Sequence, residues 1–350
     1  VRSYAEEGVL RISTDATDLI LRVASNGRLY QSYLGPRLLN ESDMQHFPAF
    51  SRGGSGSRIA EQGWETYPAS GMEDYFEPAL GIIHQDGNMT TLLKYVSSET
   101  RKIDENVSET SIILRDDVYP IEVKLYYRTF KKENIIKTWT EIRHQEKKPV
   151  TLFRYASAML YFESPHYYLT EFSGDWAKEV VMNAQELLFG KKVLDTKLGS
   201  RAAMHTSPFF QLGFGQPIAE NQGNVLLGTL GWTGNFRFTF EVDNEGNLRI
   251  ISGINPYASP YELKPGEIFK TPEFIFTLSE KGRGEAERLH RRPHRARRGE
   301  KKRDGRRRRG RAHAHRVQHP AAADEEPGTH LFLRPDLRAG VAVSYTHLTL

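Results

Sequence analysis

Apolar and polar residues alternate along much of the chain before residue 280. The clearest case is Phe236–Val242, which reads Phe-Arg-Phe-Thr-Phe-Glu-Val, and Ile121–Tyr127 shows the same period of two. This period predicts β-strands that bury one face and expose the other to solvent.

Short turn sequences separate the alternating runs. Asn26-Gly27 lies between the apolar runs Leu19–Val23 and Leu29–Leu34. An Asn-Gly pair in this position is a strong signal for a β-hairpin. The sequence Asp-Gly-Asn at residues 86–88 predicts a second hairpin in the same way, and Asp243–Asn247 predicts a turn after the strand at 236–242.

About fifteen candidate strands can be counted in this way, with closely spaced turn residues between them. The pattern is typical of an all-β fold with large antiparallel sheets packed as a sandwich or barrel. Two exceptions are predicted. Trp176–Met182 is expected to form a short helix, and a second helix is expected to begin near Gly284 and run toward His290.

Residues 41–63 interrupt the rhythm with a stretch too rich in Gly and Ser for a strand. It contains Phe50, Arg52 and Arg58. Long loops in compact domains often carry function, so this loop is either a contact site for substrate or for a neighbouring subunit, or a simple connector.

The charge is divided unevenly along the chain. Residues 281–350 hold 19 Lys/Arg and 8 Asp/Glu, which leaves 29 and 36 for residues 1–280. The first part is therefore mildly acidic (−7) and the second strongly basic (+11).

Residues 291–330 are mainly Arg, Ala, His, Gly, Glu and Pro, which are largely residues of G/C-rich codons. We predict a β domain over 1–280, the start of a linker helix over 281–290, and a disordered, low-complexity basic tail over 291–350 that is an out-of-frame or chimeric reading.

Composition excludes several classes of protein. The chain has no cysteine, which rules out disulfides and thiolate metal sites and is compatible with the cytoplasm, our predicted location. No run of 18 apolar residues predicts a membrane span, and the first residues lack the pattern of a signal peptide. The glycosylation sequons at Asn40, Asn88 and Asn106 are interpreted as chance occurrences.

Three motifs occur in order along the first 280 residues. The first, residues 65–80, reads Glu-Thr-Tyr-Pro-Ala-Ser-Gly-Met-Glu-Asp-Tyr-Phe-Glu-Pro-Ala-Leu. The second begins with Ser-Gly-Asp-Trp-Ala-Lys-Glu at residues 173–179 and continues to His-Thr-Ser-Pro-Phe-Phe at residues 205–210. The third joins Leu-Gly-Trp-Thr-Gly-Asn-Phe at residues 230–236 to Ser-Gly-Ile-Asn-Pro at residues 252–256. As an ordered set they resemble the N-terminal domain of family 36 glycoside hydrolases.

The resemblance implies a β-supersandwich that leads into a (β/α)8 barrel, and retaining hydrolysis of terminal α-galactosides by a homo-oligomeric enzyme. The two carboxyl groups that this chemistry needs are aspartates of the barrel in that family. A barrel should begin just after Leu289-His290, but no strand–helix alternation follows there. No catalytic residue is therefore assigned to this chain, which we expect to be inactive alone and to supply barrel packing and a substrate-pocket loop. No cofactor or metal is expected.

Asp74, Arg52 and Arg58 are the candidate substrate-binding residues. In the family that this chain resembles, loops of the domain reach the galactose pocket, where an aspartate would accept hydrogen bonds from sugar hydroxyls. The alternatives are that Asp74 orders its own turn and that the arginines lie in a solvated loop. Phe76 stands where the family has an arginine.

Other residues that suggest chemistry have simpler interpretations. We expect the tryptophans to pack in the core or at a domain interface, and His205 to be a structural, hydrogen-bonded histidine. The histidines of the tail lie among arginines, whose charge opposes metal binding. The tryptophans are Trp64, Trp139, Trp176 and Trp232.

Two other functions stay open from the sequence. One is a self-sufficient carbohydrate-binding sandwich. The other is nucleic-acid binding through residues 291–316, which include four consecutive arginines at 306–309. Because residues 291–330 contain no aromatic side chain to stack on bases, any such binding should be non-specific.

Overall fold

The computed structural model describes residues 8–47, 64–71, 76–201 and 204–285. The chain divides into two units, Val1–Arg291 and Arg292–Leu350, and every described residue belongs to the first. The basic tail lies outside the described residues. Its predicted disorder, nucleic-acid binding and origin therefore stay predictions, as do the predicted boundaries at residues 280 and 290.

The first sheet is a three-stranded antiparallel meander of β1 (Val9–Ser13), β2 (Thr17–Val23) and β3 (Leu29–Pro36). Val23 pairs with Leu29, so the predicted Asn26-Gly27 hairpin is confirmed. Gly27 has a φ of +81°, a conformation that glycine adopts readily. The 3₁₀ helix η1 (Glu41–His46) follows β3.

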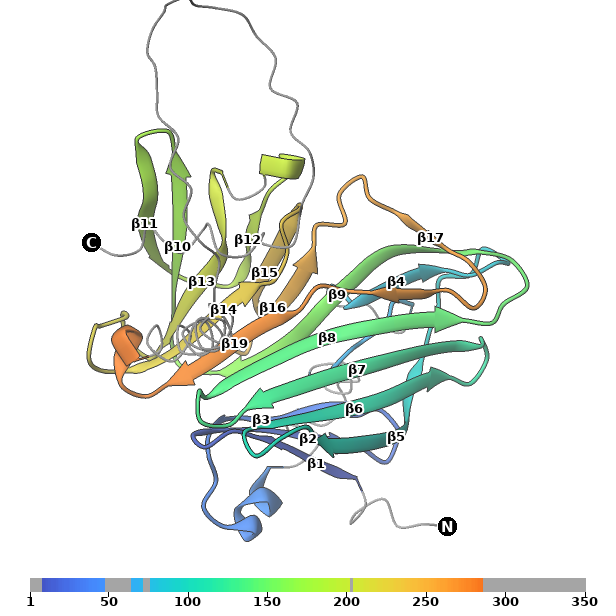
Figure 1. The fold of residues 1–350 in the computed structure, drawn as a ribbon, viewed down its shortest axis with the longest axis horizontal. Coiled ribbons are helices and arrows are strands. Elements are labelled where there is room, and N and C mark those ends of the chain that lie inside the picture. Colours follow the sequence, from blue (N-terminus) through green and yellow to red (C-terminus); the bar gives the residue numbers. More distant parts are fainter. Residues whose placement is uncertain (1–7, 48–63, 72–75, 202–203, 286–350) are drawn as a thin grey trace, which may run out of the picture. The chain divides into compact units, whose positions relative to one another are not determined.

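The second sheet has ten strands in the order β11-β10-β13-β14-β19-β8-β7-β6-β5, and β18 also pairs with β8 (Figure 1). Strand β19 separates the early strands β5–β8 from the later strands β10–β14. The strand bounds are β5 (Leu93–Lys102), β6 (Val107–Asp116), β7 (Ile121–Phe130), β8 (Ile135–His144), β10 (Tyr167–Asp175), β11 (Lys178–Glu186), β13 (Thr206–Phe214), β14 (Asn224–Leu230), β18 (Ile268–Lys270) and β19 (Phe274–Ser279).

The third sheet has six strands in the order β12-β15-β16-β9-β17, with β4 also on β9. The 3₁₀ helix η2 (Gly199–Arg201) follows β12. The bounds are β4 (Leu80–Ile83), β9 (Val150–Glu163), β12 (Gly190–Asp195), β15 (Phe236–Val242), β16 (Asn247–Ile254) and β17 (Tyr261–Leu263).

An aromatic cluster joins the two larger sheets. Phe210 of β13 lies 5.2 Å from Phe238 and 4.9 Å from Phe240 of β15, measured between ring centroids, and 6.3 Å from Phe274 of β19. All four rings are buried. The alternating strand at 236–242 therefore points its phenylalanines inward as predicted, and the expected all-β sandwich with large antiparallel sheets is confirmed.

The predicted helix at Trp176–Met182 is wrong, because this segment forms the tip and second strand of the β10–β11 hairpin. The β-branched Val180 and Val181 favour extended backbone over helix. Ala177, with a φ of +60°, adopts the left-handed conformation at the tip. The second predicted helix has its described part at residues 282–285, which are helical.

Two further expectations need correction. The Asp-Gly-Asn sequence at 86–88 makes a tight turn, but its flanking strands do not pair with each other, since β4 pairs with β9 and β5 with β6. The polar face of the strand at 236–242, expected to be exposed to solvent, is largely covered, because Thr239 and Glu241 are only 2% and 9% exposed. The described residues form nineteen strands, and no helix among them is long and apolar enough to cross a bilayer.

Candidate functional site

The first motif forms a segment, residues 64–71 and 76–80, that lies against β9 and β16. The Tyr161 hydroxyl of β9 donates to the Glu65 carbonyl at 2.6 Å. The Tyr67 hydroxyl in turn donates to the Ala156 carbonyl at 2.7 Å. These buried hydroxyls find partners as buried polar groups must, and they fix the segment on the sheet.

Residues 71 and 76–78 flank residues 72–75, which lie outside the described part of this segment. The amides of residues 79 and 80 both donate to the Pro68 carbonyl, at 2.9 and 3.1 Å, which closes the loop at its base. Gly71 begins the loop with a φ of +94°, and a Cβ there would lie 2.4 Å from the Thr90 Cα. Only glycine fits this position without moving the loop.

Glu77 anchors the returning end of the loop through three cations. Its carboxylate lies 2.6 Å from Arg154, 3.4 Å from Lys191 and 3.7 Å from Arg237. Burial disfavours the charged form, but the Arg154 hydrogen bond and the three positive charges outweigh it and lower the pKa of Glu77. Glu77 is therefore an ionised anchor, not a proton donor at neutral pH.

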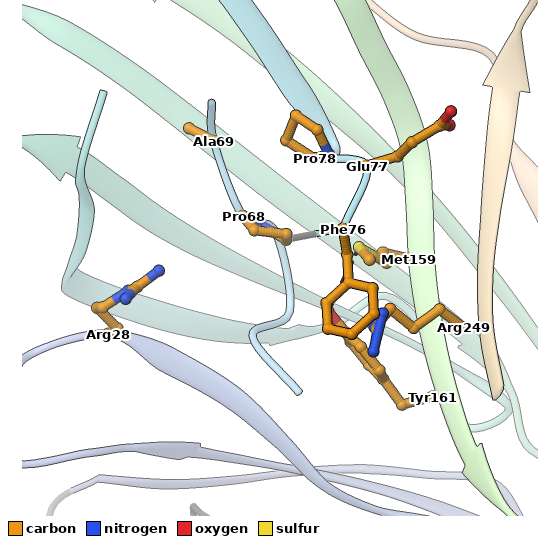
Figure 2. Close-up of a pocket in the computed structure, with 9 residues that line it drawn as sticks. All are labelled: Arg28, Pro68, Ala69, Phe76, Glu77, Pro78, Met159, Tyr161 and Arg249. Atoms are coloured by element: carbon orange, nitrogen blue, oxygen red, sulfur yellow. Dashed lines mark hydrogen bonds between the residues drawn. The ribbon is translucent and has the colours of Figure 1, made fainter. Parts of the chain in front are cut away.

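Phe76 lies beside Glu77 and covers Arg249 of β16. Figure 2 shows the Arg249 guanidinium against the Phe76 ring, with Tyr161 beside them. The cavity at this place has a volume of about 10 Å³, room for one water molecule at most. It is lined by Arg28, Pro68, Ala69, Phe76, Glu77, Pro78, Met159, Tyr161 and Arg249. A sugar does not fit, so this cavity is part of the support of the loop rather than a substrate pocket.

A buried ion pair holds the front of the same segment. The guanidinium of Arg28, the residue directly before β3, donates to the Glu65 carboxylate, and both residues are almost fully buried. Burial raises the pKa of Glu65 to about 7, against the opposing effect of Arg28.

The three candidate residues Asp74, Arg52 and Arg58 lie outside the described residues, so their roles stay predictions. The structure does describe where their loops are attached. Trp64 directly follows the stretch that holds the two arginines. Its ring stacks on Tyr161 at 5.6 Å between ring centroids. Tyr161 also lines the cavity beneath Phe76, so both loops are anchored at one ring of β9.

Sequence reasoning missed the charged groups that fix these loops. Glu77 falls inside the first motif, which was the only signal for it. Arg154, Arg237 and Arg249 sit at alternating strand positions, where a charged side chain normally indicates a solvent-facing surface. Their partners come from residues far away in sequence, so no local pattern shows that this face is covered.

A chain of three side chains in the domain has the order hydroxyl, imidazole, carboxylate. His84 Nε2 lies 2.9 Å from Thr91 Oγ1, and His84 Nδ1 lies 2.7 Å from Glu146 Oε1. This order matches that of a nucleophile relay, but all three residues are buried. The Tyr119 ring stacks on His84 at 3.5 Å. These three hydrogen-bonded side chains therefore link the turn after β4 to the turn after β8, and no substrate can reach them.

The tryptophans divide into two groups. Core packing is confirmed for Trp139, which is 4% exposed, and for Trp64, which packs partly buried against the core. Core packing is wrong for Trp176 and Trp232, which are 88% and 40% exposed. Packing of these two against another domain stays a prediction. His205 is hydrogen-bonded to the Gly174 carbonyl as expected.

The described residues offer anchored loops rather than a reaction centre. Of the two carboxylates in this segment, Glu65 is buried and Glu77 partly buried, and each is bound to arginine. No cluster of three or more metal-ligating side chains occurs among the residues that the structure places. What this arrangement can do is fix on β9 and β16 the described residues that flank stretches 48–63 and 72–75.

Solved structures share this fold. The α-galactosidase of Lactobacillus brevis superposes with a TM-score of 0.72 at 24% identity, over 81% of this chain and 41% of that one. The family 36 α-galactosidase AgaA A355E of Geobacillus stearothermophilus, in complex with 1-deoxygalactonojirimycin, gives a TM-score of 0.74 at 23% identity, over 81% and 42%. The fold is thus that of the N-terminal β-sandwich of these enzymes.

Residues 27–264 match the glycosyl hydrolase family 36 N-terminal domain, and the chain belongs to that family. The curated relatives include α-galactosidase AgaA of G. stearothermophilus, 28% identical over 62% of this chain and 32% of the relative. Another is α-galactosidase Mel36A of Lactobacillus acidophilus, 23% identical over 78% and 40%. The chain spans about a third to two fifths of the length of these relatives.

Proposed function

We propose that this chain is the N-terminal portion of an α-galactosidase that hydrolyses terminal α-galactosides with retention. The observation that supports the proposal is the family match over residues 27–264 together with relatives that are α-galactosidases. One related enzyme, an AgaA variant, has been solved in complex with raffinose and another in complex with stachyose. The proposed substrate class is the same, an oligosaccharide with a terminal α-galactosyl unit.

In this proposal the domain positions loops at the substrate pocket and packs against the catalytic domain. The anchored loop at 71–78 supports the first role, because its two ends are fixed by backbone hydrogen bonds and by Glu77. Precise positioning of a substrate contact needs such a rigid support. Exposed Trp176 and Trp232 support the second role, since large exposed aromatics mark contact surfaces.

The chain alone is expected to show no α-galactosidase activity. Retaining hydrolysis needs two carboxyl groups about 5–5.5 Å apart on either side of the scissile bond. In the described segment Glu65 is buried and Glu77 partly buried, and both are ion-paired to arginine. The measurement is release of nitrophenol from p-nitrophenyl α-galactoside by the purified chain. Turnover above the buffer rate and proportional to protein would contradict the expectation. Tight galactoside binding by the chain without turnover would favour a self-sufficient carbohydrate-binding domain.

Asp74 is expected to contact the sugar in the full-length enzyme. Asp74→Asn in that enzyme should lower kcat/KM for p-nitrophenyl α-galactoside about 10–100-fold, because a charged acceptor of sugar hydroxyl hydrogen bonds contributes about 1.5–3 kcal/mol. Arg52→Ala and Arg58→Ala should have smaller effects in the same direction. Asp86→Asn, in a turn at the other end of β4, is the matched control. Equal rates for the Asp74 variant and the control would assign Asp74 to its own turn.

A further inference from the structure

A cleft opens where turns and strand ends of all three sheets meet. Its walls come from the β1–β2 turn and the end of β3, from the β7–β8 turn and the ends of β13 and β19, and from the end of β9. Its volume is about 550 Å³, within the range of about 300–1,000 Å³ that is typical of small-ligand sites. This cleft is therefore large enough for a ligand, unlike the cavity beneath Phe76.

The cleft is separate from the segment at residues 64–80. Glu163 lines the cleft and lies nine residues along β9 from Arg154, the residue that holds Glu77. At about 3.3 Å per residue, the two places are about 30 Å apart along the strand. No described residue of the segment at 64–80 lines the cleft. A ligand bound there would therefore go beyond the proposed role of the domain at the catalytic pocket, and it would not depend on that role.

Apolar side chains form one part of the lining. Phe162 of β9 and Phe214 of β13 both line the cleft, with their ring centroids 4.9 Å apart. Leu34 of β3 and Leu278 of β19 extend this surface. Small-ligand sites typically combine such apolar surface with a few polar groups that orient the ligand. The apolar carbon face of a sugar ring can pack on a surface of this kind.

Charged side chains of both signs form the other part. Four carboxylate and three ammonium groups line the cleft, so neither sign dominates. Glu285 and Lys281 pair with each other at 3.5 Å. Lys131, Glu163 and Glu280 make no salt bridge within the part of the chain that the structure describes. These three groups are therefore available to a ligand.

A neutral ligand rich in hydroxyl groups matches this lining. A hydroxyl donates one hydrogen bond and accepts two, so it can pair with an ammonium donor and with a carboxylate acceptor alike. An anion would meet Glu163 and Glu280 and a cation would meet Lys131, and close like charges oppose binding. We propose that this cleft is a non-catalytic binding site for a short neutral oligosaccharide.

Binding at this site should be weak. Glu163 and Glu280 are exposed and Lys131 is partly exposed, so water competes for each hydrogen bond that the sugar makes. Stachyose is the probe, because a related enzyme has been solved in complex with it. We expect a Kd of about 1 mM for stachyose. Such a value differs from the tight binding that would indicate a self-sufficient carbohydrate-binding domain.

Saturation-transfer difference NMR of the full chain with stachyose tests the proposal. Asn224 lies directly across from Phe214 in the sheet, lines the cleft and is exposed. Asn224→Trp should fill the cleft and raise the Kd at least about tenfold. The matched control is Asn221→Trp, the same change in an exposed turn outside the described lining, and it should leave the Kd unchanged.

A second pair of variants tests the polar contacts without filling the cleft. Glu163→Ala removes a charged acceptor and should raise the Kd about tenfold. Glu262→Ala, on an exposed position of β17 outside the described lining, should leave it unchanged. Circular dichroism checks that each variant is folded.

Four results would each overturn the proposal. They are no saturating stachyose signal up to about 20 mM, unchanged binding by the Asn224→Trp and Glu163→Ala variants, a control that loses binding as its partner does, and binding of citrate or spermidine in place of stachyose. None of these measurements involves turnover. A failure here would therefore leave the proposed α-galactosidase function standing, and a failure of that function would leave this site standing.

Discussion

Arg28→Met is expected to destabilise the chain by about 1–2 kcal/mol at pH 8, because the buried Glu65 carboxyl loses its cation and must stay protonated about one pH unit above its wild-type pKa of about 7. Replacing both partners, as Arg28→Met with Glu65→Leu, should recover most of this loss. A pair of apolar side chains of similar size needs neither desolvation of charge nor a partner. The measurement is the midpoint of urea unfolding of the full chain.

The pH dependence gives this prediction a second signature. The folded pKa of Glu65, about 7, lies above its ordinary value of 4.5. A carboxyl with a raised pKa favours folding in its protonated form, so its contribution is fully present below about pH 4.5 and is lost as the pH rises through 7. Without Arg28, ionising the buried Glu65 carboxyl costs the folded state still more free energy. The Arg28→Met variant should therefore differ little from wild type at pH 5 and by about 1–2 kcal/mol at pH 8. An equal loss of stability at both pH values would show that ionisation of Glu65 does not cause the loss.

Phe210→Ala is expected to cost about 3–5 kcal/mol, since the Phe210 ring is the shared contact of the cluster that joins the two larger sheets. Its neighbours are Phe238, Phe240 and Phe274. Gly228 also packs under this ring, where an added Cβ would lie 2.5 Å from it. We therefore expect the surroundings to leave most of the space of the truncated ring unfilled.

Two controls define the size of this effect. Phe210→Leu keeps most of the volume and should cost less than about 1.5 kcal/mol. Val118→Ala removes a side chain that is 82% exposed and should change stability by less than about 0.5 kcal/mol. A loss of under about 1 kcal/mol for Phe210→Ala would mean that the two sheets do not depend on this cluster.

The sequence was sufficient for the class of fold because a period of two marks β-strands directly. The strand at 236–242 turned its phenylalanines to the core as the pattern required. The segment at 176–182 was misread because a short run of Lys, Glu and Met suits a helix locally. Its pairing with β10 is a tertiary contact that overrides this preference.

The candidate site was predictable only in part, for a related reason. The first motif located the loop at 71–78, and the structure shows how that loop is fixed. The cations on Glu77 come from β9, β12 and β15, up to 160 residues away in sequence. Nothing in the local pattern at Arg154 or Arg237 indicates such a partner. Asp74, Arg52 and Arg58 stay predictions.

The place of β19 in the sheet has a consequence for synthesis of the protein. Strand β19 ends at Ser279 and lies between β14 and β8, where Phe276 pairs with Ile136, a residue made 140 positions earlier. While the chain is still on the ribosome, β14 has an open edge until β19 is made, and β8 has one until both β18 and β19 are made. The domain can therefore complete its central sheet only once translation has passed residue 279. Until then its exposed strand edges are the part of the nascent chain that chaperones would need to protect.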